Sequence, residues 1–233
     1  MIAIRIDGQK IETLPGRTVL EVARERGIHI PTLCYHEALE PYGACRLCMV
    51  EVDAGRGRQL VTSCTYPCSD GLVVYTHSDA VLRSRRTTVE LLMATARNVP
   101  LIRALAAELG VGQPRFILAE DACILCGLCV RACKEIVGVG AISVINRGIE
   151  KKVSAPIRIA GSECIRCGTC VLICPTGAIT LADTSIDPPT AHAWASEFEA
   201  VGCRLCAEEV AIPKFADHLT LLGGESAREE AAP

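Results

Sequence analysis

Two runs of sequence, CILCGLCVRAC at Cys123–Cys133 and CIRCGTCVLIC at Cys164–Cys174, repeat the spacing C-x2-C-x2-C-x3-C within one chain. Pro175 closes the second run. This spacing is typical of segments that wrap cysteine thiolates around a cubane 4Fe-4S cluster. The two runs therefore predict two such clusters, and with them a place where an electron can reside.

The similarity between the two runs continues beyond their cysteines. When Cys123 is aligned with Cys164, the halves stay in step until four additional residues, Ile136–Val139. The sequence GAIS at 140–143 then matches GAIT at 177–180. A repeat of this kind predicts a duplicated half-domain in which each half has a cysteine loop, a short helix and a strand.

This spacing resembles that of bacterial two-cluster ferredoxins, in which the fourth cysteine of each run reaches across to the other cluster. The resemblance implies one cluster on Cys123, Cys126, Cys129 and Cys174, and a second on Cys164, Cys167, Cys170 and Cys133. The first run departs from the usual pattern because Lys134, not proline, follows its last cysteine. Either the Lys134 charge raises the reduction potential of a nearby cluster, or the Lys134 side chain is simply solvated.

The chain has fifteen cysteines, for which disulfides and zinc are the alternative uses. A disulfide framework is disfavoured by the odd number, by the absence of a leader before the strand-like MIAIRIDGQK, and by the short C-x2-C separations. Zinc sites use two C-x2-C pairs separated by a longer loop. A third and a fourth cysteine that follow so closely favour an iron–sulfur cluster over zinc.

Composition excludes other function classes. The net charge is only −3 and the basic residues are not clustered, so no nucleic-acid partner is expected. No run of 18 apolar residues occurs, so no direct membrane insertion is expected. The chain also lacks a GxGxxG motif after a strand and a P-loop, so any nicotinamide or flavin must bind to another subunit. We expect a cytoplasmic protein.

The first part of the chain has the pattern of a β-grasp fold. Apolar residues alternate in 2–6, Asp7-Gly8 is typical of a hairpin turn, and 9–14 forms the second strand. Thr18 and Glu21 then make a capping box for a helix that Gly27 is expected to end. Further strands are expected around two cysteine-bearing loops.

These loops carry a C-x10-C-x2-C-x15-C set formed by Cys34, Cys45, Cys48 and Cys64. Two cysteines for each of two irons suit a 2Fe-2S cluster, as a variant of the plant-type scheme with a longer first gap. His36 superficially suggests a Rieske site, but no C-x2-H partner exists. His36 is therefore interpreted as a surface or neighbouring residue and not as a ligand.

PTLCYHEALEPYGACRLCMVEV at 31–52, TSCTYPCSDGLVV at 62–74 and the downstream repeat together resemble a known family. They are similar to the small diaphorase subunit of NAD-linked hydrogenases and to the N-terminal region of the large cluster subunit of complex I. Parts of iron-only hydrogenases and of some formate dehydrogenases are also similar. The resemblance implies Cys64 as the fourth 2Fe-2S ligand. Cys68 is then a spare thiol or, less favoured, an alternative ligand.

One departure from this family concerns the middle of the chain. The family carries a further 4Fe-4S cluster there, bound by one histidine and three cysteines, but residues 79–122 contain neither residue type. Leu101, Ile102, Leu105 and Leu109 have helical spacing instead. We therefore expect packed hydrophobic side chains in place of that cluster, and three clusters in total.

The predicted architecture is α+β. It comprises an N-terminal β-grasp 2Fe-2S domain at 1–79, a helical linker at 80–115, a bacterial-type dicluster 4Fe-4S ferredoxin domain at 116–185 and a tail at 186–233. Cys203 and Cys206 form a lone C-x2-C in the tail. They are half of a zinc site or, as favoured here, free or partner-bound thiols in a small helical tail.

The expected role is electron transfer through one 2Fe-2S and two 4Fe-4S clusters, with catalysis on other subunits. The resemblance implies a flavoprotein diaphorase-type partner and a catalytic partner such as a hydrogenase, a formate dehydrogenase or another molybdenum or tungsten enzyme. Two alternatives stay open: a stand-alone redox-sensing iron–sulfur protein, and a detached cluster module of a larger enzyme.

Overall fold

The computed structural model describes the chain except at residues 56, 155–163, 166, 180–197, 203–208 and 214–233. Two compact units can be separated. The first comprises Met1–His36 and Glu40–Cys126, and the second comprises Glu37–Leu39 and Gly127–Pro233. No helix of the described residues is long and apolar enough to cross a membrane.

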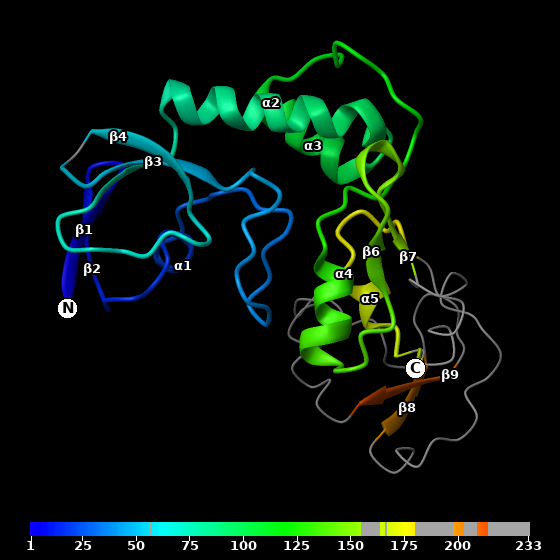
Figure 1. Cartoon of the computed structure of the whole chain (residues 1–233). Helices are drawn as coiled ribbons and strands as arrows, with labels where there is room; N and C mark the ends of the chain where they lie inside the picture. The colour runs from blue at the N-terminus through cyan, green and yellow to red at the C-terminus, as the bar shows by residue number, and fades with distance from the viewer. Residues whose placement is uncertain (56, 155–163, 166, 180–197, 203–208, 214–233) are drawn as a thin grey trace, which may run out of the picture. The chain divides into compact units, whose positions relative to one another are not determined.

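The first unit is built on a five-stranded mixed sheet in the order β2-β1-β5-β3-β4. Figure 1 labels four of these strands, β1 to β4. Its strands are β1 (Ile2–Ile6), β2 (Gln9–Thr13), β3 (Met49–Asp53), β4 (Arg58–Thr62) and β5 (Val73–Tyr75). Strands β1 and β5 are parallel, and the other neighbours are antiparallel. The predicted hairpin is confirmed, with Ile4 opposite Ile11.

Helix α1 (Val19–Glu25) packs its apolar residues against this sheet. The capping box is present, because the Thr18 hydroxyl accepts from the Glu21 N–H and the Glu21 carboxylate accepts from the Thr18 N–H. Val19, Leu20 and Ala23 are fully buried with strand residues in one core. Helix and sheet together form the predicted β-grasp arrangement.

Two further helices, α2 (Asp79–Ala96) and α3 (Pro100–Leu109), pack against each other in the same unit. They share a second apolar core with Leu33 and Leu47, which flank the cysteines of the 2Fe-2S loops. Ile102 is fully buried there, and Leu105 and Leu109 are also buried. An apolar helix is therefore present at the residues for which helical spacing predicted one.

Because Ile102 is fully buried in this second core, we expect Ile102→Ala to lower the free energy of unfolding of the first unit by about 2–5 kcal/mol. Leu91→Ala is the matched control, because Leu91 on α2 is 54% exposed and should cost less than about 0.5 kcal/mol. Denaturant unfolding of the metal-free protein measures both. Equal effects would contradict a packed core at α3.

The second unit contains the cysteine repeat. Its elements are α4 (Leu128–Arg131), the π-helical turn η1 (Ala132–Ile136), β6 (Ser143–Ile145), the 3₁₀ turn η2 (Gly148–Glu150), β7 (Lys152–Ser154), α5 (Thr169–Leu172), β8 (Phe198–Gly202) and β9 (Glu209–Pro213). Strands β6 and β7 pair, as do β8 and β9. The hairpin of β8 and β9 corrects the expectation of a helical tail. Cys203 and Cys206 lie outside the described residues.

Both halves of the repeat begin their helix in the same way. Gly127 precedes α4 with φ 77°, and Gly168 precedes α5 with φ 71°. This left-handed conformation favours glycine because it has no Cβ. The halves differ after the last cysteine: η1 continues beyond Cys133, whereas Pro175 follows Cys174 and has no backbone N–H to continue a helix.

Candidate metal centres

The four cysteines predicted to hold a 2Fe-2S cluster all lie in the first unit. Cys34 follows α1, Cys45 and Cys48 precede β3, and Cys64 lies in the turn after β4. Cys34, Cys48 and Cys64 are at most 1% exposed. These sulfur atoms are thus shielded from water, as the ligands of a redox cluster need to be.

The sulfur atoms form two pairs. The Cys45 N–H donates to Cys34 Sγ over 3.3 Å, and the Sγ atoms of Cys48 and Cys64 lie 3.4 Å apart. Each iron of a 2Fe-2S cluster takes two cysteine thiolates. Two sulfur pairs of this kind match that donor set.

The protons of these pairs are shared unequally in the metal-free protein. A hydrogen bond from the Cys34 thiol lowers the pKa of Cys45 to about 5, and a hydrogen bond with Cys64 lowers the pKa of Cys48 to about 7. The same bonds, followed by burial, raise the pKa of Cys34 and of Cys64. Each pair therefore tends to hold one proton between two sulfurs, which a metal ion can displace.

The loop that brings Cys45 to this site has an unusual backbone. Gly43 has φ 67° and Arg46 has φ 56°, both in the left-handed region. A Cβ on Gly43 would meet Thr65 Cγ2 at 3.4 Å, next to the turn that carries Cys64. Gly43 thus suits both the sharp turn and the close approach of two cysteine-bearing loops.

Cys68 has different surroundings from the paired cysteines. It is 5% exposed in the core under α1, and its N–H donates to the Arg17 carbonyl over 2.7 Å. Burial raises the pKa of Cys68 to about 11, with Arg17 and Glu21 as the charges that act on it. These features suit a spare thiol better than a ligand.

Two buried side-chain atoms of the described residues, Ser63 Oγ and Arg85 Nε, have no hydrogen-bond partner. Ser63 is adjacent to Cys64, and its N–H donates to the Cys48 carbonyl. Arg85 donates from Nη2 to the carbonyl of Met49, which follows Cys48. Unsatisfied buried donors beside the sulfur pairs are suited to an anionic group. The residues present therefore fit a 2Fe-2S cluster.

Neither residue belongs to a sequence motif that predicts the site. For Arg85 a signal exists, because Val81, Arg85 and Val89 follow one another at four-residue spacing and are all buried on α2. A charged residue within an apolar helical stripe needs a partner. Ser63 carries no comparable signal in the sequence.

In the second unit, one cavity is lined by the four cysteines of the second predicted cubane, Cys133, Cys164, Cys167 and Cys170. The rest of the wall is mostly apolar and includes Val137, Val139, Ala141, Ile142 and Ile165. Four sulfurs around a mostly apolar cavity fit a cluster whose four irons each take one thiolate.

Burial dominates the electrostatics of this cavity. It raises the pKa of Cys167 and raises the pKa of Cys170 to about 12. The charges of neighbouring cysteines, Cys133 and Cys164 among them, raise the pKa of both further. Crowded thiolates of this kind are unfavourable without a cation, and iron removes that penalty.

The cysteines of the other predicted cubane belong to different units. Cys123 and Cys126 lie in the first, and Cys129 and Cys174 lie in the second, so this grouping stays a prediction. Burial raises the pKa of Cys174, but hydrogen bonds involving Thr176 and backbone groups outweigh it and lower the pKa overall.

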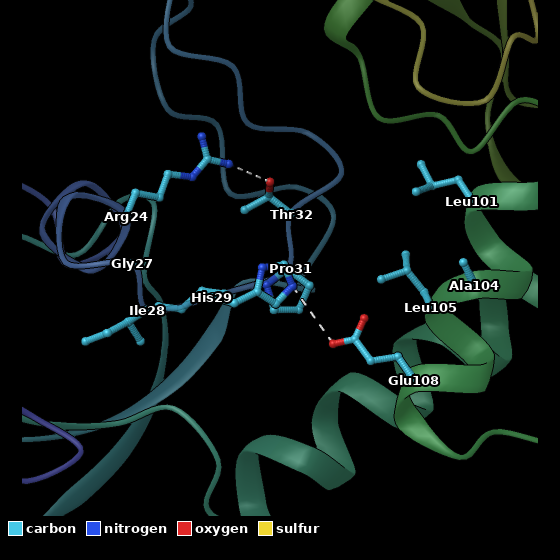
Figure 2. Close-up of a pocket in the computed structure, with 11 residues that line it drawn as sticks. Arg24, Gly27, Ile28, His29, Pro31, Thr32, Leu101, Ala104, Leu105 and Glu108 are labelled. Atoms are coloured by element: carbon cyan, nitrogen blue, oxygen red, sulfur yellow. Dashed lines mark hydrogen bonds and ion pairs between the residues drawn. The ribbon is translucent and has the colours of Figure 1, made fainter. Parts of the chain in front are cut away.

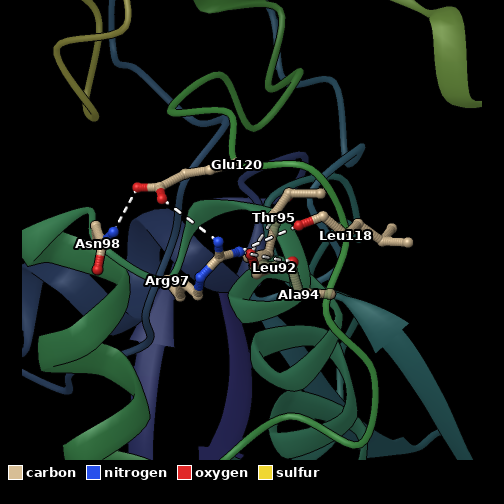
Figure 3. A network of polar contacts seen from close by, with 7 residues as sticks. All are labelled: Leu92, Ala94, Thr95, Arg97, Asn98, Leu118 and Glu120. Carbon is tan, nitrogen blue, oxygen red and sulfur yellow. Dashed lines mark hydrogen bonds and ion pairs between the residues drawn. The ribbon is translucent and has the colours of Figure 1, made fainter.

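A polar network ties the segment before Cys123 to the end of α2 (Figure 3). Arg97 Nη1 donates to the Leu118 carbonyl over 3.2 Å, and Glu120 accepts from Arg97 and Asn98. The Cys123 N–H donates to Asp121 Oδ1 over 2.8 Å. The approach to Cys123 is therefore ordered by contacts within the first unit.

No three His, Cys, Asp or Glu side chains of the described residues are arranged to hold a single metal ion. Cluster ligands need not converge on one point, because they bind different irons. The described cysteines also form no disulfide.

A separate cavity in the first unit lies between residues 27–32 and α3 (Figure 2). Ile28, Leu101 and Leu105 contribute apolar wall, and His29 Nε2 lies 3.9 Å from Glu108 Oε1. No cysteine lines this cavity.

Two family models match the chain. A 2Fe-2S iron-sulfur cluster binding domain matches residues 1–79, and a 4Fe-4S dicluster domain matches residues 122–178 and again 163–209. These matches confirm the predicted fold class and the presence of both kinds of cluster domain.

Among curated proteins, a component of the NADH-quinone oxidoreductase of Rhizobium meliloti (strain 1021) is 32% identical, over 77% of this chain and 24% of the relative. The NADP-reducing hydrogenase subunit HndD of Solidesulfovibrio fructosivorans is 35% identical, over 77% and 36%. The NADH-ubiquinone oxidoreductase 75 kDa subunit of Reclinomonas americana is 30% identical, over 83% and 31%. The chain thus spans about a quarter to a third of the length of these relatives.

A solved structure is similar over more of its own length. A chain in the crystal structure of NAD+-reducing [NiFe]-hydrogenase in the H2-reduced state matches with a TM-score of 0.61 and 28% identity. The match covers 92% of this chain and 88% of that chain.

Proposed function

Since this chain belongs to the iron–sulfur proteins homologous to cluster-bearing components of NADH-quinone oxidoreductases and hydrogenases, we propose that it conducts electrons between two partner subunits. It would hold one 2Fe-2S cluster on Cys34, Cys45, Cys48 and Cys64. Two 4Fe-4S clusters would be held by the cysteines of the repeat. The proposal extends to a cytoplasmic location, where disulfides are rare and thiols stay reduced.

The observation that carries this proposal is the combination of sulfur pairs and sulfur-lined cavity described above. An iron–sulfur cluster supplies one-electron storage, and the protein's cysteines hold it while apolar walls exclude water. A series of such clusters passes single electrons between sites where substrates react.

The names of the relatives support a proposal for the partners. All three curated relatives described above are named for NADH or NADP, and the similar structure is of an NAD+-reducing hydrogenase. We infer a flavoprotein that exchanges electrons with NAD(H) at one end and a catalytic subunit at the other. A hydrogenase fits that second place, and so does a formate dehydrogenase or another molybdenum or tungsten enzyme.

Iron and sulfide assays on the anaerobically purified chain test the cluster count. One two-iron and two four-iron clusters should give about ten iron atoms per chain. About six iron atoms per chain would mean that the protein holds only one 4Fe-4S cluster, and about fourteen would mean that it holds three. Anaerobic purification from native extract tests the partners, because a chain that runs alone would favour a redox sensor.

A further inference from the structure

Arg85 is a buried charge with no carboxylate partner among the described residues. It lies on α2, is 2% exposed, and forms no ion pair within the part of the chain that the structure describes. Its Nη2 donates to the Met49 carbonyl over 2.7 Å, while Nε has no partner. A cationic side chain is costly to bury unless a negative group compensates it.

The surroundings of Arg85 point to the 2Fe-2S site. Burial lowers the pKa of Arg85, and the charge that most strongly opposes this is Cys48, ahead of Glu108 and Asp7. Ser63, whose buried hydroxyl has no partner with hydrogen-bond geometry but lies near enough to the Cys48 thiol to help lower its pKa, contacts the Cys48 backbone and precedes Cys64. Both unsatisfied donors therefore lie beside the segment that carries Cys48, and Ser63 also directly precedes Cys64.

We propose that Arg85, assisted by the Ser63 hydroxyl, stabilises the negative charge of the 2Fe-2S cluster at its Cys48 and Cys64 side and so raises its reduction potential. The inference rests on the proposed function, because it presupposes the cluster. Four thiolates and two sulfides make the cluster anionic, and reduction of one ferric iron to ferrous iron adds another negative charge. A nearby buried cation favours that reduced state more than the oxidised one.

The test is a redox titration of the full-length protein with dithionite and mediators, followed through the electron paramagnetic resonance signal of the reduced 2Fe-2S cluster. Arg85→Met keeps the length and loses the charge. It should lower the equilibrium constant for reduction at least about tenfold, which is about 59 mV for one electron. Arg85→Lys retains the charge and should stay within about threefold of the wild type. Ser63→Ala should give a smaller decrease than Arg85→Met.

Arg86→Met is the matched control. Arg86 is the next residue on α2, and its Nε donates to the Leu109 carbonyl over 2.9 Å. This change also removes an arginine and a hydrogen bond to a backbone carbonyl, but at the α3 end. The reduction potential of the 2Fe-2S cluster should be the same in Arg86→Met as in the wild type.

A loaded Arg85→Met protein with the wild-type potential would overturn the inference, since Arg85 would then only support the Met49 carbonyl. If Arg85→Met does not retain the cluster, Arg85→Lys decides, because a tenfold decrease in that loaded protein also excludes the charge effect. Failure of the proposed function is distinguishable, because the wild-type protein itself would then lack the 2Fe-2S signal.

Discussion

Replacement of Cys64 by alanine is expected to abolish the 2Fe-2S cluster. Cys64 is fully buried and its Sγ lies 3.4 Å from that of Cys48, so no water can reach the site easily to replace the lost ligand. Iron should fall from about ten to about eight atoms per chain. The electron paramagnetic resonance signal of the reduced 2Fe-2S cluster should disappear, while the 4Fe-4S signals persist.

Cys68→Ala is the control for this change. Cys68 lies four residues further along the chain and is also buried, but Arg17 and Glu21 are the charges around it. Iron content and the 2Fe-2S signal should equal those of the wild type. Loss of the signal in Cys68→Ala with retention in Cys64→Ala would assign the fourth ligand to Cys68 instead.

Two double variants should distinguish which cysteines share a cubane. Cys133 and Cys170 line one cavity, so Cys133→Ala with Cys170→Ala should remove one cluster and leave about six iron atoms per chain. Cys133→Ala with Cys129→Ala should remove both cubanes and leave about two, because the predicted sets place these cysteines on different clusters. Iron and sulfide assays after anaerobic reconstitution give the counts.

If the Cys133 and Cys170 double variant instead leaves about two iron atoms, each cysteine run binds its own cluster and contributes no ligand to the other. In that case Cys133 and Cys129 would share a cubane, and their double variant would retain about six iron atoms. Lys134→Ala is the control, because Lys134 is exposed and adjacent to Cys133. It should leave the iron count unchanged and so exclude a general disturbance of η1.

Local patterns predicted much of the fold. The alternation in β1, the Asp7-Gly8 turn and the Thr18 and Glu21 capping box depend on residues close in sequence, and all three are present. The glycines of the two cysteine runs likewise adopt the same left-handed φ. Such features are predictable because their energies come from neighbouring residues and not from distant packing.

Predictions that depended on distant contacts were less complete. The tail was expected to be helical, but its described part forms the hairpin of β8 and β9, whose stability depends on strand pairing. Arg85 is likewise not among the residues predicted for the site. Its place in an apolar helical stripe indicates that it needs a partner, but the identity of that partner follows only when α2 packs against β3 and brings the guanidinium to Met49, 36 residues earlier in the chain.

The sequence by itself determined the kinds of cluster domain, because cysteine spacing sets which loop can wrap around a cubane or a binuclear cluster. It also determined that residues 79–122 contain no histidine or cysteine, on which the prediction of three clusters depends. Only the tertiary structure decided which sulfurs of the candidate 2Fe-2S site pair, that the buried Cys68 has Arg17 and Glu21 as the charges acting on it, and that two unsatisfied donors lie beside the Cys48 and Cys64 pair. These features depend on tertiary packing between loops and helices, which the local spacing of residues does not specify.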